Sequence, residues 1–272
     1  MSYLNNFYHQ FYGPETGRRW IFVHGLMGYG QNWRKIVAGL ESTERCFVYD
    51  QRGHGRSFHP VSGGYAPEDY AQDLLKIADE LEWETFNLVG HSMGGRNVLN
   101  FAALHPERID HLVIEDIGPE GAENAHEYYE YLLNSVPTPF QTRAEAKTYF
   151  FETFIHNVRT RERAEVMANY FYSNMAEQPD GTVSWRFDKQ GIIDSVKMGR
   201  GGDRWAEVRA LKCPTLWIRG ENSKELSSEN YQKVLESNPL IQGIEIPGAG
   251  HWVHADQPQA FLQALKDFVG GF

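Results

Sequence analysis

This chain of 272 residues has little cysteine, no long apolar run and no excess of positive charge. Its two cysteines, Cys46 and Cys213, are too few for the disulfide framework of a small secreted domain. Both lie in apolar stretches, which predicts two buried thiols. No apolar run reaches the roughly 18 residues that a membrane-spanning helix needs. Residues 1–14 also lack the basic and apolar regions of a signal peptide. We therefore expect a cytoplasmic protein without a membrane span.

The charge balance argues against a nucleic-acid partner. The chain carries 26 Lys and Arg against 36 Asp and Glu, a formal net charge of -10. Proteins that bind nucleic acids normally present a basic surface, and this composition does not favour one. The 16 Phe, 7 Trp and 14 Tyr can fill a substantial core. The chain thus suits one large folded domain with a small-molecule partner.

Apolar runs alternate with amphipathic stretches in the first 117 residues and again after residue 206. This alternation predicts βαβ units, hence an α/β fold with a mostly parallel central sheet flanked by helices. The predicted strands are 20–23, 46–49, 86–89, 112–114, 214–218 and 243–246. The predicted helices are 32–40, 67–81, 93–105, 227–236 and 258–269.

The segment 118–205 has a different pattern, rich in Tyr, Phe and charge at helical spacing. It predicts a helical cap insertion in a single domain whose core is formed by residues 1–117 and 206–272. Most cap aromatics should fill the interior, and some should line a cleft below the cap. These aromatics are Tyr128, Tyr129, Tyr131, Phe150, Phe151, Phe154, Tyr170, Phe171 and Tyr172.

Ser92 is the candidate nucleophile. It lies in Gly90-His-Ser-Met-Gly94, a G-x-S-x-G pattern that follows a predicted strand and precedes a predicted helix. Glycines at 90 and 94 permit a sharp turn without a Cβ clash. That turn would present the serine hydroxyl at the carboxyl edge of the sheet.

A serine nucleophile needs a base, and on this architecture the order along the chain is Ser, acid, His. His251 and His254 are the histidines beyond the last predicted strand. A flexible turn, 247–250, leads directly to His251, which we expect to be the base, with His254 as the alternative. A metal site at these two histidines would need more ligands than Asp256 nearby, so we expect no metal and no other cofactor.

The acid has two candidates. Many enzymes with a serine nucleophile on this architecture carry an aspartate where this chain has Ser223. A serine there has no charge to stabilise an imidazolium. Glu221 lies in the same loop but out of register. Asp116 ends the strand that follows the serine unit, and neighbouring strands are only about 4.8 Å apart. We predict Asp116 as the acid and keep Glu221 as the alternative.

Two backbone N–H groups should bind the oxyanion. Met93, the residue after the nucleophile, supplies one, and Leu26, in the loop after the first predicted core strand, supplies the other. The charged loop with Arg52, His54 and Arg56 could hold an anion, but we expect it to be structural.

The order of these motifs resembles the α/β-hydrolase superfamily, most closely its small bacterial acyl esterases and its mitochondrial abhydrolase-domain esterases. The resemblance covers about residues 18–117 and 206–270 but not the cap. In that subgroup the acid is the aspartate of an Asp-Ile-x-Pro segment, which implies Asp116 here. The motifs are His24-Gly-Leu26, Asp50-Gln-Arg-Gly-His-Gly-Arg-Ser57, Gly90-His-Ser-Met-Gly-Gly95, Asp116-Ile-Gly-Pro119, Arg219-Gly-Glu-Asn-Ser223 and Gly248-Ala-Gly-His-Trp-Val-His254.

The prediction is a serine hydrolase that cleaves small carboxylic esters or thioesters through an acyl-enzyme. Carbon–carbon bond hydrolysis, lactone hydrolysis and cofactor-free perhydrolysis use the same triad and remain alternatives. A ligand receptor with little turnover is the alternative from another class. Dehalogenases and epoxide hydrolases are disfavoured because they need a carboxylate where Ser92 stands.

Overall fold

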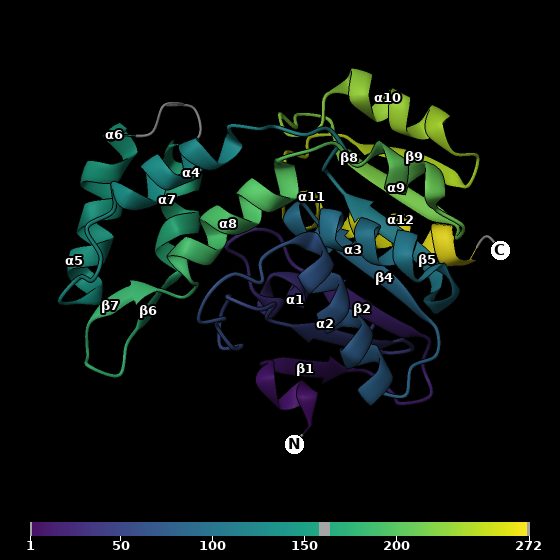
Figure 1. Ribbon diagram of the computed structural model, residues 1–272, viewed down its shortest axis with the longest axis horizontal. Coiled ribbons are helices and arrows are strands. Elements are labelled where there is room, and N and C mark those ends of the chain that lie inside the picture. The colour runs from purple at the N-terminus through teal and green to yellow at the C-terminus, as the bar shows by residue number, and fades with distance from the viewer. Residues whose placement is uncertain (1, 158–163, 271–272) are drawn as a thin grey trace.

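One sheet dominates the computed structural model, which describes residues 2–157 and 164–270. Within that part of the chain, seven strands are arranged in the order β1-β3-β2-β4-β5-β8-β9 (Figure 1). Only β1 runs antiparallel, against β3, and the other neighbours are parallel. The strands are β1 (His9–Tyr12), β2 (Arg19–Val23), β3 (Arg45–Tyr49), β4 (Phe86–His91), β5 (Ile109–Glu115), β8 (Thr215–Gly220) and β9 (Ile241–Ile246).

The central strands are buried on both faces. Every residue of β4 and β8 is buried, as expected for parallel strands that helices cover on both sides. Alternate side chains belong to two different apolar clusters. Ile21 of β2 and Leu88 of β4 belong to one cluster, whereas Phe22 and Val89 belong to the other. The strand period of two therefore builds a core on each face of the sheet.

Helices from both halves of the chain complete these cores. On one face lie α2 (Pro67–Glu80), α3 (Met93–Leu104), α9 (Trp205–Ala210) and α10 (Ser228–Ser237). On the other lie α1 (Arg34–Ala38), α11 (Val253–Asp256) and α12 (Pro258–Gly270). Short 3₁₀ turns are η1 (Tyr3–Asn6), η2 (Gly30–Trp33) and η3 (Pro106–Arg108). The predicted α/β fold with a mostly parallel sheet is confirmed.

The described chain between β5 and β8 comprises α4 (Ala125–Asn134), α5 (Arg143–Thr148), the π-helix η4 (Tyr149–Phe154), α6 (Ile155–Asn157), α7 (Ala164–Ser173), β6 (Met175–Glu177), β7 (Val183–Trp185) and α8 (Lys189–Arg200). The part of the chain from α4 to α7, with β6 and β7, lies beside the sheet, at the left of Figure 1, and α8 leads back from it towards the sheet. These elements have their own apolar cluster, which includes Phe150, Phe154, Phe171 and Trp185. Residues 158–163 of the predicted cap lie outside the described residues.

Three local features differ from the sequence-based expectation. β1 was not predicted, and all four of its residues are only half-buried at the sheet edge, so its apolar signal is weak. The pair β6 and β7 interrupts a segment predicted to be helical, and three-residue strands are too short to show a period. The single helix predicted over 32–40 is instead a 3₁₀ turn followed by α1.

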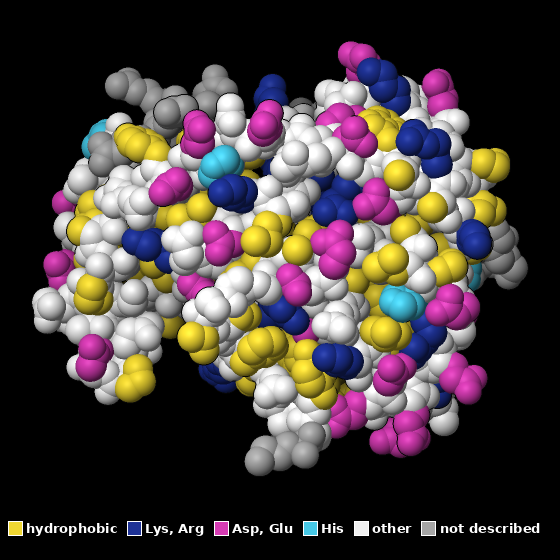
Figure 2. All heavy atoms as spheres, in the orientation of Figure 1, with side chains coloured by type: hydrophobic (Ala, Val, Ile, Leu, Met, Phe, Trp, Pro, Cys, Tyr) yellow, Lys and Arg dark blue, Asp and Glu magenta, His cyan; other side chains and the backbone are white. Residues whose placement is uncertain are grey.

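The surface and the thiols agree with the composition. On the face shown in Figure 2, acidic and basic side chains are interspersed. Cys46 and Cys213 are both free and buried, as predicted. Among the described residues, no helix has both the length and the apolar character needed to cross a bilayer.

Candidate active site

Ser92 occupies a sharp turn between β4 and α3. Its φ of 54° and ψ of -117° lie outside the regions that most residues adopt. Its backbone N–H donates to Glu115 O at 3.0 Å, which fixes the turn against β5. A Cβ on Gly90 would lie 2.5 Å from Gly94 O, and one on Gly94 would lie 2.5 Å from His24 O. Both glycines are therefore required by the close approach of α3 to the sheet.

Three side chains far apart in sequence form one hydrogen-bonded chain. His251 Nε2 lies 3.0 Å from Ser92 Oγ, and His251 Nδ1 lies 2.8 Å from Asp116 Oδ2. Asp116 is fully buried at the carboxyl end of β5, also with a positive φ, of 51°. His251 follows β9. This geometry permits proton transfer from the serine to the imidazole, with the carboxylate holding the other ring nitrogen.

The loop after β8 serves Asp116 instead of replacing it. Gly220 N–H donates to Asp116 Oδ1 at 2.9 Å, and the Ser223 hydroxyl donates to Oδ2. The serine at the position where many such enzymes carry the acid therefore hydrogen-bonds the acid candidate. Glu221 faces elsewhere, because its Oε2 accepts a hydrogen bond from Gly248 N–H at 2.8 Å. Of the two predicted acids, Asp116 is the one that contacts His251.

Two buried histidines fix the loop that carries Leu26. His24 Nε2 accepts from Gln51 N–H at 2.9 Å, and His54 Nε2 accepts from Met27 N–H at 3.2 Å. Burial lowers the pKa of His24 to about 4. Burial, with repulsion from His24, lowers the pKa of His54 to about 3. Both rings are thus neutral at pH 7, as their acceptor roles require.

These histidines predict loss of stability in mild acid. An unfolded histidine binds a proton below its ordinary pKa of about 6.5, whereas His24 and His54 stay neutral until much lower pH. Their contribution is present above pH 6.5 and is lost as the pH falls towards 4. We expect urea denaturation to show about 4 kcal/mol less stability at pH 5 than at pH 7.5, roughly 2 kcal/mol for each ring. His54→Gln should reduce the difference by about 2 kcal/mol, the share of that ring. Equal stability at both pH values would contradict the argument.

His254, the alternative base, makes a separate pair. It is buried, its Nδ1–H donates to Glu115 Oε2 at 2.8 Å, and its backbone N–H donates to Glu115 Oε1 at 2.8 Å. His91 lies beside it and donates from Nε2 to His251 O at 2.9 Å. Burial first, then repulsion from His251 and His254, lowers the pKa of His91 well below its usual value. These contacts hold the loop that presents His251.

The same three side chains, His91, Glu115 and His254, are the group among the described residues with metal-ligand spacing, their ligand atoms lying within 4.8 Å of one another. Each makes one of the hydrogen bonds given above. The hydrogen bonds account for the group without an ion.

Removal of the Glu115 carboxylate should destabilise the protein. Glu115→Ala leaves two buried donors of His254 without an acceptor, which should cost about 3 kcal/mol in the free energy of unfolding. Glu221→Gln is the matched control, because that exposed side chain makes one surface bond and should cost less than about 1 kcal/mol. Chemical denaturation of both variants measures the difference. Equal costs would show that the Glu115–His254 pair is not structurally important.

The charged loop after β3 is held by an ion pair to α2. Arg52 donates from Nε and Nη2 to the two carboxylate oxygens of Asp73, at 2.6 and 2.5 Å, and from Nη1 to Gly64 O. This bidentate pair, buried between the loop and α2, matches the predicted structural role.

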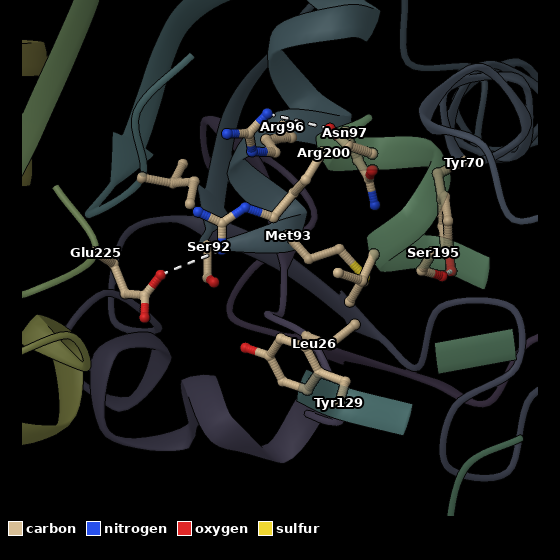
Figure 3. A pocket seen from close by; sticks show the side chains of 13 residues that line it. Leu26, Tyr70, Ser92, Met93, Arg96, Asn97, Tyr129, Ser195, Arg200 and Glu225 are labelled. Atoms are coloured by element: carbon tan, nitrogen blue, oxygen red, sulfur yellow. Dashed lines mark hydrogen bonds and ion pairs between the residues drawn. The ribbon is translucent and has the colours of Figure 1, made fainter. Parts of the chain in front are cut away.

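Two cavities meet at Ser92. The larger cavity has a volume of about 210 Å³, and its walls are mostly apolar but contain His251. Its walls include Leu26, Tyr128, Leu132, Met167, Tyr170 and Trp252. The smaller, of about 40 Å³, follows α3 and includes Met93 and Arg96 (Figure 3). The predicted cap aromatics divide accordingly. Tyr128, Tyr129, Tyr170 and Phe171 line the larger cavity, whereas Phe150 and Phe154 are buried in the apolar cluster.

Glu115 and Arg96 were not predicted to belong to this region. Both carry a usable signal, because a charged residue in an otherwise apolar strand or helix start needs a buried partner. Ser223 was identified from the sequence by its position in the loop, but its hydrogen bond to Asp116 was not predicted.

Comparisons with known proteins agree with this fold. A family model described as alpha/beta hydrolase fold matches residues 21–258. Esterase YbfF of Escherichia coli K12 is 30% identical over 251 residues, which cover 92% of each chain. The sn-1-specific diacylglycerol lipase ABHD11 of Danio rerio is 26% identical, with 98% of this chain and 83% of the relative covered. A solved structure, a marine microorganism esterase, has a TM-score of 0.83 at 28% identity and covers 96% of this chain and 98% of its own.

Proposed function

Because this chain belongs to the α/β-hydrolase family, we propose that it is a serine esterase that hydrolyses small carboxylic esters or thioesters. The observation that carries the proposal is the hydrogen-bonded chain Ser92–His251–Asp116, which opens into two cavities. The esterase and lipase names of the similar proteins support ester chemistry.

In the proposed mechanism, Ser92 attacks the scissile carbonyl while His251 accepts its proton. Asp116 holds the imidazole in the required tautomer and stabilises the cation that forms. The backbone N–H groups of Leu26 and Met93 bind the oxyanion, each contributing about 3 kcal/mol to lowering the barrier. His251 then protonates the leaving group, and water hydrolyses the acyl-enzyme by the same sequence of proton transfers. No step needs a metal or an organic cofactor.

We infer that residues 118–205 act as a cap over a core formed by 1–117 and 206–272. The larger cavity supports this inference, because it combines α4 and α7 side chains with Ser92 and His251 of the core. Tyr170 also donates from its hydroxyl to Leu26 O and packs against Trp252. The two buried free thiols fit a reducing compartment, so we propose a cytoplasmic location.

A fluorophosphonate probe and a panel of nitrophenyl esters test the proposed function. The esterase predicts rapid labelling of Ser92, seen by peptide mass spectrometry, and repeated turnover of short esters. Labelling with a single turnover would instead indicate a ligand receptor on the same fold. Failure to label would contradict Ser92 as a nucleophile.

Substitutions in the larger cavity should change preference for substrate size. Leu132→Ala and Met167→Ala enlarge this cavity, so bulky esters should gain about tenfold relative to methyl acetate. Met198→Ala is the control, because Met198 is exposed on α8 and lines neither cavity. The readout is the ratio of kcat/KM values for bulky and small esters. If both cavity variants lose activity equally on all esters, the cap side chains have only a structural role.

A further inference from the structure

The smaller cavity contains a buried cation one helical turn from the nucleophile. Arg96 follows Ser92 by four residues on α3, and its backbone N–H donates to Ser92 O. Residues at this spacing lie on adjacent turns, about 6 Å apart along the helix axis. Figure 3 shows Arg96, Arg200 and Glu225 around Ser92. The cavity thus offers a cationic group at a short, fixed distance from the proposed site of acylation.

Arg96 has no carboxylate partner among the residues that the structure describes. Only 3% of its surface is exposed. Its Nη1 donates to Gly199 O at 3.1 Å, its Nη2 donates to Glu120 O, and its Nε, although buried, has no hydrogen-bond partner in the described part of the chain. Both acceptors are neutral carbonyls.

Two carboxylates attract Arg96 without forming an ion pair with it: Glu120, whose buried Oε1 has no hydrogen-bond partner among the described residues, and Glu225. Glu225 lines the cavity, but its Oε2 lies 3.3 Å from Arg200 Nη1. Arg204 pairs with Glu207 at 2.7 Å and with Glu68 at 3.5 Å. Burial, with repulsion from Arg200 and Arg204, lowers the pKa of Arg96 to about 9, despite attraction from Glu120 and Glu225. At neutral pH Arg96 is therefore a charged group with no carboxylate in hydrogen-bonding contact among the described residues, and the Glu120 and Glu225 carboxylates attract it only from a longer distance.

A buried guanidinium is stabilised by a carboxylate, which accepts two parallel N–H bonds from it. An incompletely compensated charge of this kind is costly in a folded protein, and a ligand that carries a contacting carboxylate recovers part of that cost on binding. Two other polar groups of the cavity, the Ser195 and Tyr70 hydroxyls, are bonded to each other at 2.7 Å.

The position of His251 decides which part of the ester occupies this cavity. The base must protonate the leaving group, so the leaving group lies on the same side as His251. His251 lines the larger, apolar cavity and is absent from the walls of the smaller one. The acyl chain therefore extends along α3 towards Arg96. A cavity of about 40 Å³ holds roughly three water-sized positions, which suits a short chain with a small polar end.

We propose that the preferred substrate is a monoester or monothioester of a short dicarboxylic acid, with its free carboxylate bound to Arg96 and an apolar leaving group in the larger cavity. This proposal rests on the proposed esterase function. Hydrolysis then releases a dicarboxylate and an apolar alcohol or thiol, with water supplying the hydroxyl and the proton.

The test compares monobenzyl succinate with benzyl levulinate, in which a neutral acetyl group replaces the carboxylate at nearly the same size. Benzyl alcohol release gives kcat/KM for each ester at pH 7.5. We expect the wild type to prefer the succinate by about tenfold or more. Arg96→Met should abolish that preference, and Arg96→Lys should retain part of it. Arg204→Met is the matched control, since Arg204 is also buried but lines neither cavity, and should leave the ratio unchanged.

The outcomes separate the two proposals. Hydrolysis of benzyl levulinate with no preference for the succinate would overturn the Arg96 site but keep the esterase function. An unchanged ratio in Arg96→Met would overturn it too, because a purely structural role lowers both activities equally. The para-carboxybenzyl ester of butyrate places the charge on the leaving group, and a preference for it over benzyl butyrate would contradict the acyl-side assignment. Hydrolysis of none of these esters, or of the nitrophenyl panel, would contradict the esterase function itself.

Discussion

Ser92→Ala should lower kcat for ester hydrolysis by about 10⁴-fold or more and should abolish covalent labelling. The serine hydroxyl is the only group of the proposed site placed to form the acyl-enzyme, with its Oγ 3.0 Å from His251 Nε2. His251→Ala should be as severe, because an unassisted serine is a weak nucleophile. Nucleophile and base act as a unit, so the double variant should be no slower than either single variant, within a few-fold.

Kinetics on a nitrophenyl ester, with thermal denaturation of each variant, measure this result. The stability of Ser92→Ala should stay near wild type, since that change removes a single hydroxyl. His254→Ala tests whether His254 has a structural role or is the catalytic base. It should lower stability through the loss of its bonds to Glu115, but reduce kcat far less than His251→Ala. Residual activity of Ser92→Ala within tenfold of wild type would rule out the assignment, and a reversal of the two histidine effects would move the base to His254.

Asp116→Asn should lower kcat by about 10³-fold or more with little change in KM. The amide is nearly the same size as the carboxylate, but it has no charge for the imidazolium and can favour the wrong tautomer. In the serine protease triad the same change costs about 10⁴ in kcat. Asp116 is fully buried, but an amide there keeps an oxygen to accept from Gly220 N–H and gains an NH₂ that can donate to the Ser223 hydroxyl, so the fold should tolerate the change. Steady-state kinetics across the pH range measure the loss.

Glu221→Gln is the control for the alternative acid. It should change kcat less than tenfold, because Glu221 is at the surface, where its carboxylate accepts a hydrogen bond from Gly248 N–H. Ser223→Asp in the Asp116→Asn background tests whether a carboxylate near His251 is sufficient even when it is carried by residue 223 instead of residue 116. Ser223 already reaches the Asp116 carboxylate, so a new carboxylate there should restore part of the rate. A larger loss in Glu221→Gln than in Asp116→Asn would contradict the assignment.

Local sequence predicted the elements that carry strong patterns. The buried strands β2, β3, β4, β5 and β8 appear as short apolar runs, and α2 appears from Pro67 and its apolar spacing. These patterns are sufficient because parallel strands covered on both faces must be apolar along their whole length. β1 and the β6–β7 pair were not predicted, because short edge strands obtain their pairing from the partner strand and not from their own composition.

The sequence alone predicted an α/β fold and the candidate serine, histidines and acids, because glycine spacing and the succession of apolar runs are local properties, and the order of its motifs resembles that of α/β hydrolases. Tertiary structure shows which candidates lie in contact. It brings Asp116, which follows β5, to His251 beyond β9, makes Ser223 a donor to that carboxylate, and pairs His254 with Glu115. It also leaves Arg96 buried without a carboxylate partner in the described chain. Charges and hydrogen bonds act over a few ångströms, so these roles depend on which strands are neighbours in the sheet.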